Sequence, residues 1–175
     1  PELTEVRDER DHVFIGAATT HAAIEDGRVP DPTGGFLRKV ARGIAYRAVR
    51  NRGTVGGSLA HADPAADWVS AMAVLDAGIV LHGPDGERVV PASQFVLGIM
   101  STAMGESEVL AGVRVPKLSA NARWSYWKYC RKTGEFAEAI GAFVADPGRN
   151  MWRGVMGATE GAPGVSEDAR SLDPA

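Results

Sequence analysis

The chain has 175 residues, of which 45% are hydrophobic and 23% are charged, and its formal net charge is −3. This composition is typical of a globular protein large enough to bury a core, and it lacks the clustered basic residues of a nucleic-acid-binding protein. No stretch approaches the roughly 20 apolar residues of a membrane-spanning helix, and no secretory signal is visible, so we expect a cytoplasmic protein. The single cysteine, Cys130, cannot by itself form a disulfide or a four-cysteine iron–sulfur or zinc site.

The order of apolar runs and loops predicts a mixed, α+β chain. Alternating or continuous apolar runs indicate strands, apolar residues at three- and four-residue spacing indicate helices, and clusters of Gly, Pro and Asp indicate loops. In chain order, we expect a strand at 13–18, a helix at 21–25, a loop at 29–35, a helix at 36–49, a loop at 50–58, a helix at 64–75, strands at 78–82 and 87–90, a short helix at 91–97, a strand at 108–115, a polar linker at 117–123, and strands at 124–131, 139–145 and 152–158.

Single residues support these assignments. Thr19 or Thr20 can cap the first helix, because a hydroxyl can accept a hydrogen bond from a free amide of the first turn. Gly43 weakens the second helix, and Pro64 fits the first turn of the third. The polar linker is our candidate boundary between two domains, residues 1–118 and residues 119–175.

A glycine-rich stretch is the most informative part of the sequence. Gly53, Gly56 and Gly57 remove side chains where a backbone must approach a ligand closely or take a positive φ. Thr54 and Ser58 place hydroxyls on either side. Such a turn can present several backbone N–H groups to an anion such as a pyrophosphate. The stretch matches neither the P-loop nor the Rossmann glycine motif, which disfavours those two classes.

Charged residues flank the glycines. Asp63 and Asp67 can accept hydrogen bonds from sugar-like hydroxyls, or they can simply complement the start of the following helix. The short basic cluster of Arg47, Arg50 and Arg52 has either phosphates or nearby carboxylates as its expected partners.

Four segments together resemble the FAD-binding, medium subunit of the xanthine dehydrogenase and carbon monoxide dehydrogenase family, the molybdenum hydroxylases. The family's motifs are I-G-A-x-T-T-H, R-N-x-G-T-[IV]-G-G-[SND], A-[HD]-x-D-P-[AS]-x-D and R-x-G-[DE]-[FW]-A. The first three are matched in the same order by IGAATTH at 15–21, RNRGTVGGS at 50–58 and AHADPAAD at 60–67, and RKTGEFA at 131–137 is similar to the fourth.

The resemblance implies a set of cofactor-binding residues. It places the glycine stretch against the FAD pyrophosphate and ribityl region, Asp67 near the ribityl hydroxyls, and His61 close to the cofactor. It places Phe136 against the isoalloxazine, although packing in a core is an equally valid interpretation. Lys128 is a candidate for favouring a reduced, anionic flavin. The full set is Thr54, Val55, Gly56, Gly57, Ser58, His61, Asp63, Asp67, Lys128 and Phe136.

The resemblance also implies a fold and a function. We expect the second subdomain of a PCMH-type (vanillyl-alcohol-oxidase-like) FAD-binding domain in residues 1–118, followed by the beginning of the family's α+β C-terminal domain in residues 119–175. The subunit would relay electrons from [2Fe–2S] clusters on a small partner subunit to a small-molecule acceptor, while a large partner holds the molybdenum cofactor. The family's first glycine loop, A-G-G-[TQH]-[SD], is not found here. The alternative is therefore a non-catalytic scaffold that keeps the fold without FAD.

The remaining histidines and aromatics have simpler expected roles. We expect His12 and His82 on the surface and His21 in a structural role. In the aromatic run that begins at Trp124, alternate side chains should share one face of a strand: Trp124 with Tyr126, and Trp127 with Tyr129. Packing is the expected role of this run, with a wall near the flavin or a partner contact as the alternative.

Overall fold

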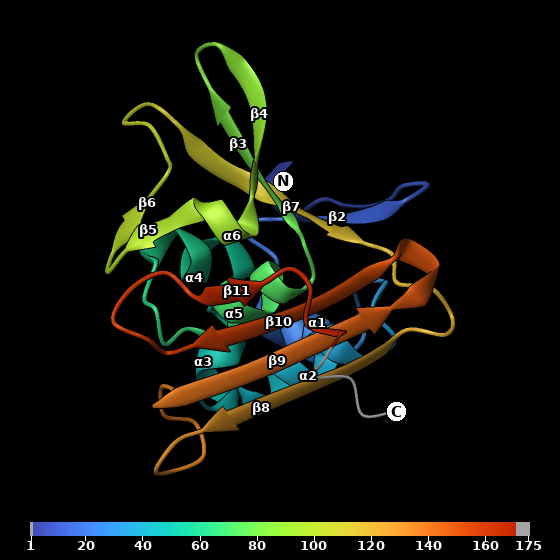
Figure 1. Cartoon of the computed structure of the whole chain (residues 1–175). Helices are drawn as coiled ribbons and strands as arrows, with labels where there is room; N and C mark the ends of the chain where they lie inside the picture. The colour runs from blue at the N-terminus through green and yellow to red at the C-terminus, as the bar shows by residue number, and fades with distance from the viewer. Residues whose placement is uncertain (1, 171–175) are drawn as a thin grey trace.

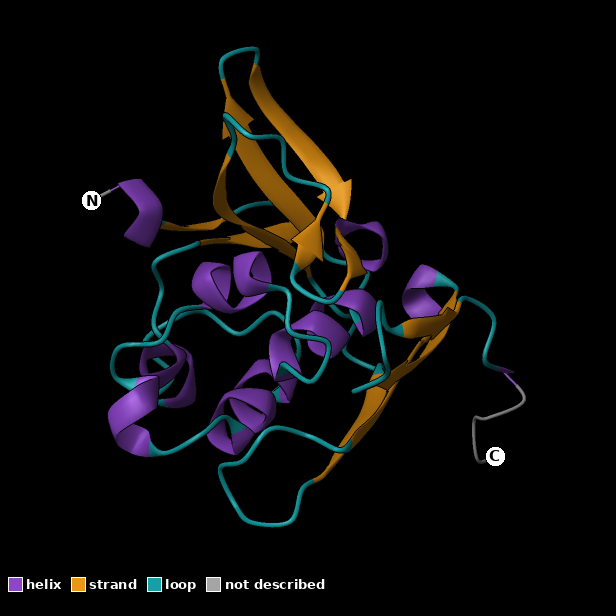
Figure 2. Ribbon diagram, turned by 90° about the vertical axis from the view of Figure 1, so that its left-hand side faces the viewer, coloured by secondary structure: helices purple, strands orange, loops and turns teal. Residues whose placement is uncertain are grey.

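The structure, a computed structural model, describes residues 2–170 and consists of two antiparallel sheets with helices between them (Figures 1 and 2). The larger sheet has the order β1 (Val6–Asp8), β2 (His12–Gly16), β7 (Val109–Pro116), β3 (Gly78–Gly83) and β4 (Gly86–Pro91). The smaller sheet has the order β11 (Gly164–Ser166), β10 (Met151–Gly157), β9 (Ala139–Asp146) and β8 (Arg123–Tyr129). A short hairpin pairs β5 (Val96–Gly98) with β6 (Ser101–Thr102).

Six α-helices of the described residues connect the strands. They are α1 (His21–Glu25), α2 (Phe36–Gly43), α3 (Arg47–Arg50), α4 (Val55–His61), α5 (Asp67–Val74) and α6 (Ala92–Phe95). Two 3-10 turns, η1 (Glu2–Thr4) and η2 (Pro147–Arg149), complete the regular structure. Since all named strands pair antiparallel, the expected α+β class is confirmed. No helix within residues 2–170 is long and apolar enough to cross a bilayer.

Helix α5 lies at the centre of the molecule. All of its residues are buried, and it packs against β9, β10, α2, α4 and α6. A helix that is apolar on all sides is stable in water only when other elements surround it. One continuous cluster of buried side chains therefore extends from Ile79 of the larger sheet to Val144 of the smaller one.

The smaller sheet presents two different faces. Trp124 and Tyr126 face inward and meet the ring of Phe36 edge-on, at centroid distances of 5.4 and 5.8 Å. Trp127 and Tyr129 stack on the other face and are 62% and 49% exposed. The predicted alternation of aromatic side chains along this strand is confirmed.

Three sequence-based expectations were wrong in their boundaries. The helix expected at 36–49 is broken: α2 ends at Gly43, Ala45 has a φ of 42°, and α3 begins at Arg47. The break is held by Arg50, whose guanidinium donates to the carbonyl oxygens of Ile44 and Ala45 at 2.8 Å each. No periodic pattern in the sequence indicates these side-chain-to-backbone bonds.

The other two errors concern the glycine-rich stretch. The expected loop at 50–58 is helical in its second half, because α4 begins at Val55. The next helix begins at Asp67 rather than at Pro64, which lies in the preceding turn. Strands β1, β5, β6 and β11 were not expected, since two or three residues are too few to show a period.

Candidate functional site

A cavity of about 580 Å³ lies where α4 begins, bordered by the turn before α5, by β8 and by the β8–β9 turn. Segments far apart in the sequence meet here, as the expectation of a shared site requires. The predicted residues that line it are Thr54, Gly57, Ser58, His61, Asp63, Asp67, Lys128 and Phe136.

Val55 and Gly56 lie beneath the cavity rather than in its wall. Both are buried, and a Cβ on Gly56 would lie 2.7 Å from the Cα of Ala17. Gly53 is restricted in the same way, because a Cβ there would lie 2.8 Å from Nε2 of His21. These two glycines allow close packing around the start of α4. Gly53, which is half-buried, and Gly57, which is exposed, both line the cavity.

The backbone amides of the first turn of α4 are already hydrogen-bonded within the chain. Val55 and Gly56 donate to the carbonyl oxygens of Thr19 and Ala17, at 3.0 and 2.9 Å. Gly57 donates to Oγ1 of Thr54, which caps the helix, and Ser58 donates to the Thr54 carbonyl. The expectation that this turn presents several free N–H groups to an anion is therefore wrong. What reaches the cavity is the bare Cα of Gly57 and the side chains of Thr54 and Ser58.

Asp67 is the most constrained charged residue of the site. Its Oδ1 accepts from the hydroxyl of Tyr126 at 2.7 Å, and its Oδ2 lies 2.8 Å from Nζ of Lys128. Both charged side chains are nearly buried, at 5% and 10% exposure. Burial and the neighbouring carboxylate raise the pKa of the Tyr126 hydroxyl well above its ordinary value, so it remains a donor. The interpretation of Asp67 as a simple helix cap is inadequate, because its partners belong to β8.

His21 forms part of the cavity wall, which the sequence did not indicate. Its Nδ1 accepts a hydrogen bond from Nε1 of Trp68 at 2.9 Å, so the neutral ring carries its proton on Nε2. Burial, assisted by the charge of Arg50, lowers the pKa of His21 to about 4 although Asp67 opposes the shift. His21 is thus a neutral, buried donor at the edge of the site.

Two residues of the arginine cluster have carboxylate partners, which was one of the two expectations. Arg50 binds Glu25 through two nitrogens, at 2.8 and 3.1 Å, and Arg47 binds both Glu25 and Asp26. Hydrogen bonds from Arg50 in particular hold the pKa of the Glu25 carboxyl below its usual range. Arg52 lines the cavity instead, and no ion pair involves it within residues 2–170.

Other side chains that line the cavity are more exposed to solvent. Phe136 is 61% exposed on the β8–β9 turn, and His61 is exposed at the end of α4. Asp63 is partly engaged, because its Oδ1 accepts from the amide of Ala65 at 2.8 Å. Among the other lining residues, the sequence analysis noted Arg52 and Gly53 but did not include them in the cofactor-binding set. It did not place His21, Ile44, Ala45, Val49, Ala66, Gly134 or Glu135 at the site.

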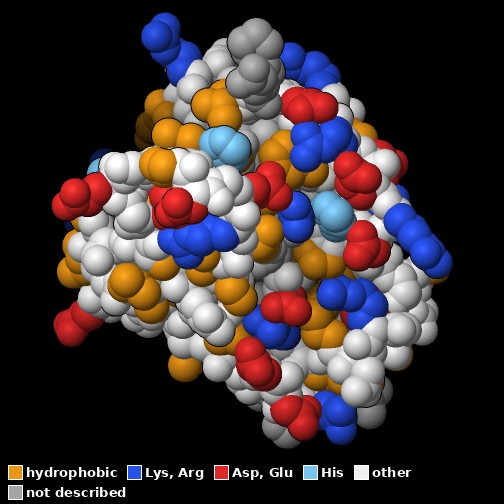
Figure 3. All heavy atoms as spheres, turned by 90° about the horizontal axis from the view of Figure 1, so that it is seen from above, with side chains coloured by type: hydrophobic (Ala, Val, Ile, Leu, Met, Phe, Trp, Pro, Cys, Tyr) orange, Lys and Arg blue, Asp and Glu red, His pale blue; other side chains and the backbone are white. Residues whose placement is uncertain are grey.

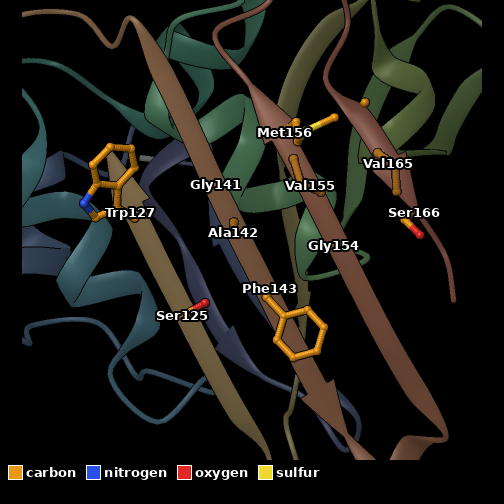
Figure 4. A pocket seen from close by; sticks show the side chains of 11 residues that line it. Ser125, Trp127, Gly141, Ala142, Phe143, Gly154, Val155, Met156, Val165 and Ser166 are labelled. Atoms are coloured by element: carbon orange, nitrogen blue, oxygen red, sulfur yellow. The ribbon is translucent and has the colours of Figure 1, made fainter. Parts of the chain in front are cut away.

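A second hollow, of about 730 Å³, lies on the outer face of the smaller sheet (Figure 4). Trp127, Phe143 and Met156 line it, and no predicted site residue does. On the face of the molecule seen from above, acidic and basic side chains are interspersed, with no large patch of one sign (Figure 3). In the part of the chain that the structure describes, no acidic or basic side chain lines the hollow on the smaller sheet, in contrast to the cavity at the start of α4.

The model for a family described as the FAD binding domain in molybdopterin dehydrogenase matches residues 1–118. This chain belongs to that family. Among curated members, the carbon monoxide dehydrogenase medium chain of Hydrogenophaga pseudoflava is 40% identical over 144 residues, which cover 82% of this chain and 50% of the relative. The nicotine 6-hydroxylase medium subunit of Paenarthrobacter nicotinovorans is 30% identical over 94% of this chain and 57% of the relative.

Solved structures from the family agree with this membership. Carbon monoxide dehydrogenase from Hydrogenophaga pseudoflava lacking the Mo-pyranopterin moiety superposes with a TM-score of 0.88 at 35% identity, over 98% of this chain and 61% of that one. Quinoline 2-oxidoreductase from Pseudomonas putida 86 gives a TM-score of 0.84 at 34% identity, over 94% and 58%. The chain spans about half the length of the curated relatives it matches. The expected resemblance and FAD-binding-domain fold are confirmed, and the homologues are oxidoreductase subunits.

Proposed function

We propose that this FAD-binding-domain family member forms part of a flavin site and relays electrons from iron–sulfur clusters on a partner subunit to an external acceptor. The observation that carries the proposal is the cavity at the start of α4. It gathers hydroxyls, a buried acid–base pair and an exposed aromatic ring from segments up to 82 residues apart, Thr54 to Phe136. Such convergence of polar groups in a concave site is typical of cofactor pockets.

The chemistry of the lining fits FAD, whose two ends are a flat ring system and a nucleotide joined by a pyrophosphate. Arg52 offers a cation that is free of ion pairs within residues 2–170, and Thr54 and Ser58 offer hydroxyl donors to phosphate oxygens. Gly57 presents no side chain, so a ligand can approach the start of α4 closely. Phe136 can cover an aromatic ring and exclude water from it.

Lys128 can act on a bound flavin by charge and by a hydrogen bond. An ammonium has three N–H donors, and Lys128 uses two of them, on Asp67 and on the Gly43 carbonyl at 3.2 Å. The third remains for a ligand. Because Asp67 balances its charge, Lys128 stabilises an anionic ligand less than an unpaired lysine would. Asp67 in turn fixes the ammonium in position.

When bound, FAD would supply the redox chemistry, since a flavin exchanges electrons singly or in pairs. The residues of this chain bind, orient and shield, and none of them needs to act as a general acid or base. The proposed partners are a large subunit with the molybdenum cofactor and a small subunit with [2Fe–2S] clusters. The names of the relatives support this arrangement, because they are medium chains of dehydrogenases.

A scaffold that holds no flavin is the second candidate, and one observation favours it. The amides of Val55 to Ser58 are bonded within the chain, so they do not form an anion cradle. The family's first glycine loop is also not found in this sequence. In that case, any FAD bound by the complex would be held by groups that lie outside these 175 residues.

Titration of FAD, followed by flavin fluorescence, tests the two candidates. We expect weak binding to this chain alone, because the family's first glycine loop is not found in this sequence and water screens the charged contacts. Supplying the family's first glycine loop on the same polypeptide should bring binding into the submicromolar range. The Arg52→Gln variant should weaken it in that extended chain. Absence of flavin from the extended, folded chain and from its complex with the partner subunits would establish the scaffold instead.

A further inference from the structure

A third cavity, of about 380 Å³, lies between α2 and the end of β8. Its lining includes Lys39 and Arg42 of α2, Trp127 of β8 and Thr133 of the β8–β9 turn. Its volume is within the range of small-molecule sites. We call this cavity the α2–β8 groove.

The groove is separate from the proposed flavin cavity, although the two are neighbours. The wall between them consists of the break after α2 and the β8–β9 turn. Nζ of Lys128 donates to the Gly43 carbonyl across this wall, and a Cβ on Gly134 would lie 3.1 Å from the ring of Tyr46. Only Lys128 and Gly134 belong to the linings of both cavities.

The charge of the groove is of one sign. Its lining contains Lys39, Arg42 and Lys128 and no carboxylate. Within residues 2–170 no carboxylate pairs with Lys39 or Arg42, both of which are exposed. Arg47 and Arg50, a few residues further along, are by contrast paired with Glu25. In a chain with a net charge of −3, two unpaired cations beside a third are a local feature rather than a general excess of basic residues.

The groove also offers a flat aromatic surface. Trp127 is 62% exposed and lies in the groove's wall, and Thr133 adds a hydroxyl from the turn. Exposed indole rings stack on planar ligands, and a guanidinium and an ammonium bind phosphate oxygens through charge-assisted hydrogen bonds. Cations and a stacking surface in one cavity match a ligand that carries both a phosphate and an aromatic ring.

We propose that the α2–β8 groove binds a phosphorylated aromatic small molecule of the mononucleotide class. Lys39 and Arg42 bind the phosphate, and Trp127 stacks on the base. This site is independent of the proposed flavin site, since none of these three residues lines the other cavity.

Calorimetric titration of the 175-residue chain with adenosine 5′-monophosphate, inorganic phosphate and adenosine tests the proposal. The monophosphate should bind more tightly than either part, because charge and stacking both contribute. Arg42→Gln should weaken its binding at least tenfold, and Arg42→Lys should restore most of it. Trp127→Ser should weaken the monophosphate while leaving inorganic phosphate unchanged.

Matched controls make the result decisive. Arg10→Gln removes the same charge from an exposed turn between β1 and β2, outside every cavity lining described above, and should leave binding unchanged. Gly57→Val alters only the flavin cavity and should also leave it unchanged. Equal loss in Arg10→Gln, loss in Gly57→Val, full binding in Arg42→Gln or no binding to the folded chain would each overturn the proposal. FAD titration of Arg42→Gln provides a separate readout, which should match that of the unmodified chain.

Discussion

Lys128 of β8 lies 2.8 Å from Asp67 of α5, and this ion pair joins the two parts of the chain for which we predicted a boundary at residue 118. Tyr126, two residues before Lys128, donates to the same carboxylate. The contact therefore connects the smaller sheet to the helix at the centre of the molecule, at the edge of the proposed flavin cavity. A buried pair of this kind fixes the relative position of its two elements, and loss of one partner destabilises the fold because the other charge is left unpaired.

Removal of one partner of this pair should lower the stability of the fold. Lys128→Met leaves a buried carboxylate without its cation, and we expect a loss of about 3–5 kcal/mol in the free energy of unfolding, measured by urea denaturation. The double variant Asp67→Asn with Lys128→Met should recover part of this loss, because it also removes the charge that was left unpaired. A single variant within about 1 kcal/mol of the unmodified chain, the range of exposed pairs, would show that the pair is not buried in solution.

The two adjacent glycines of α4 should respond differently to substitution. Gly56→Ala should destabilise the fold, because a Cβ there would lie 2.7 Å from the backbone of Ala17. Gly57→Val should leave the chain folded, apart from crowding of Thr54 Oγ1 at 2.9 Å, but should reduce flavin binding in the extended chain. Thermal unfolding and flavin fluorescence separate the effects. Stoichiometric FAD in folded Gly57→Val would remove Gly57 from the proposed site.

Protonation of His21 should destabilise the chain in acid. Its pKa of about 4 in the folded state lies below its ordinary value of 6.5, so the unfolded state binds this proton first. The stabilisation is fully present above about pH 6.5 and is lost as the pH falls towards 4. It amounts to roughly 3 kcal/mol, on the basis of 1.36 kcal/mol per pKa unit.

The variant His21→Gln isolates this contribution, because a glutamine oxygen can still accept from Trp68. Urea denaturation of both chains at intervals between pH 7 and pH 4 should show a steeper loss for the unmodified chain. Parallel curves would mean that His21 is accessible to protons in the folded state.

Arg50 should contribute far more than Arg47 to the free energy of unfolding, although both bind Glu25. Arg50 is 12% exposed and also holds the carbonyl oxygens of Ile44 and Ala45, whereas Arg47 is 47% exposed. Arg50→Met should lower the free energy of unfolding by about 2–3 kcal/mol, the cost of leaving buried acceptors unsatisfied. Arg47→Met should have a much smaller effect, because solvent screens an exposed pair. Equal losses would indicate that the break after α2 does not depend on Arg50.

Much of the fold and of the site could be predicted from the sequence, because period and turn chemistry are local. The strand that contains Ile15 and the alternation around Tyr126 follow from apolar patterns in a few neighbouring residues. The sequence analysis also identified eight of the 17 residues that line the cavity. Their assignment as cofactor-binding residues stays a prediction, as does the domain division at residue 118.

The errors share a physical cause, which is hydrogen bonding that the apolar period and the turn residues do not indicate. Gly56 looks like a ligand-binding glycine, yet its amide donates to Ala17, on a segment 39 residues away. The wall of the cavity near Ile44 depends on Arg50 and on Lys128, and neither bond leaves a local pattern. Sequence reasoning therefore found about half of the residues at the site but not which of their polar groups are free.

The single core that reaches from Ile79 to Val144 has a consequence for how such chains diversify. The C-terminal sheet and the segment before it cannot change independently, because α5 lies against strands of one and helices of the other. A sheet transferred from another family member would carry side chains that pack against the α5 helix of that member. Recombination between members would succeed only where Asp67, Lys128 and the apolar residues around Trp68 were inherited together, so the natural unit of exchange crosses the polar linker instead of ending at it.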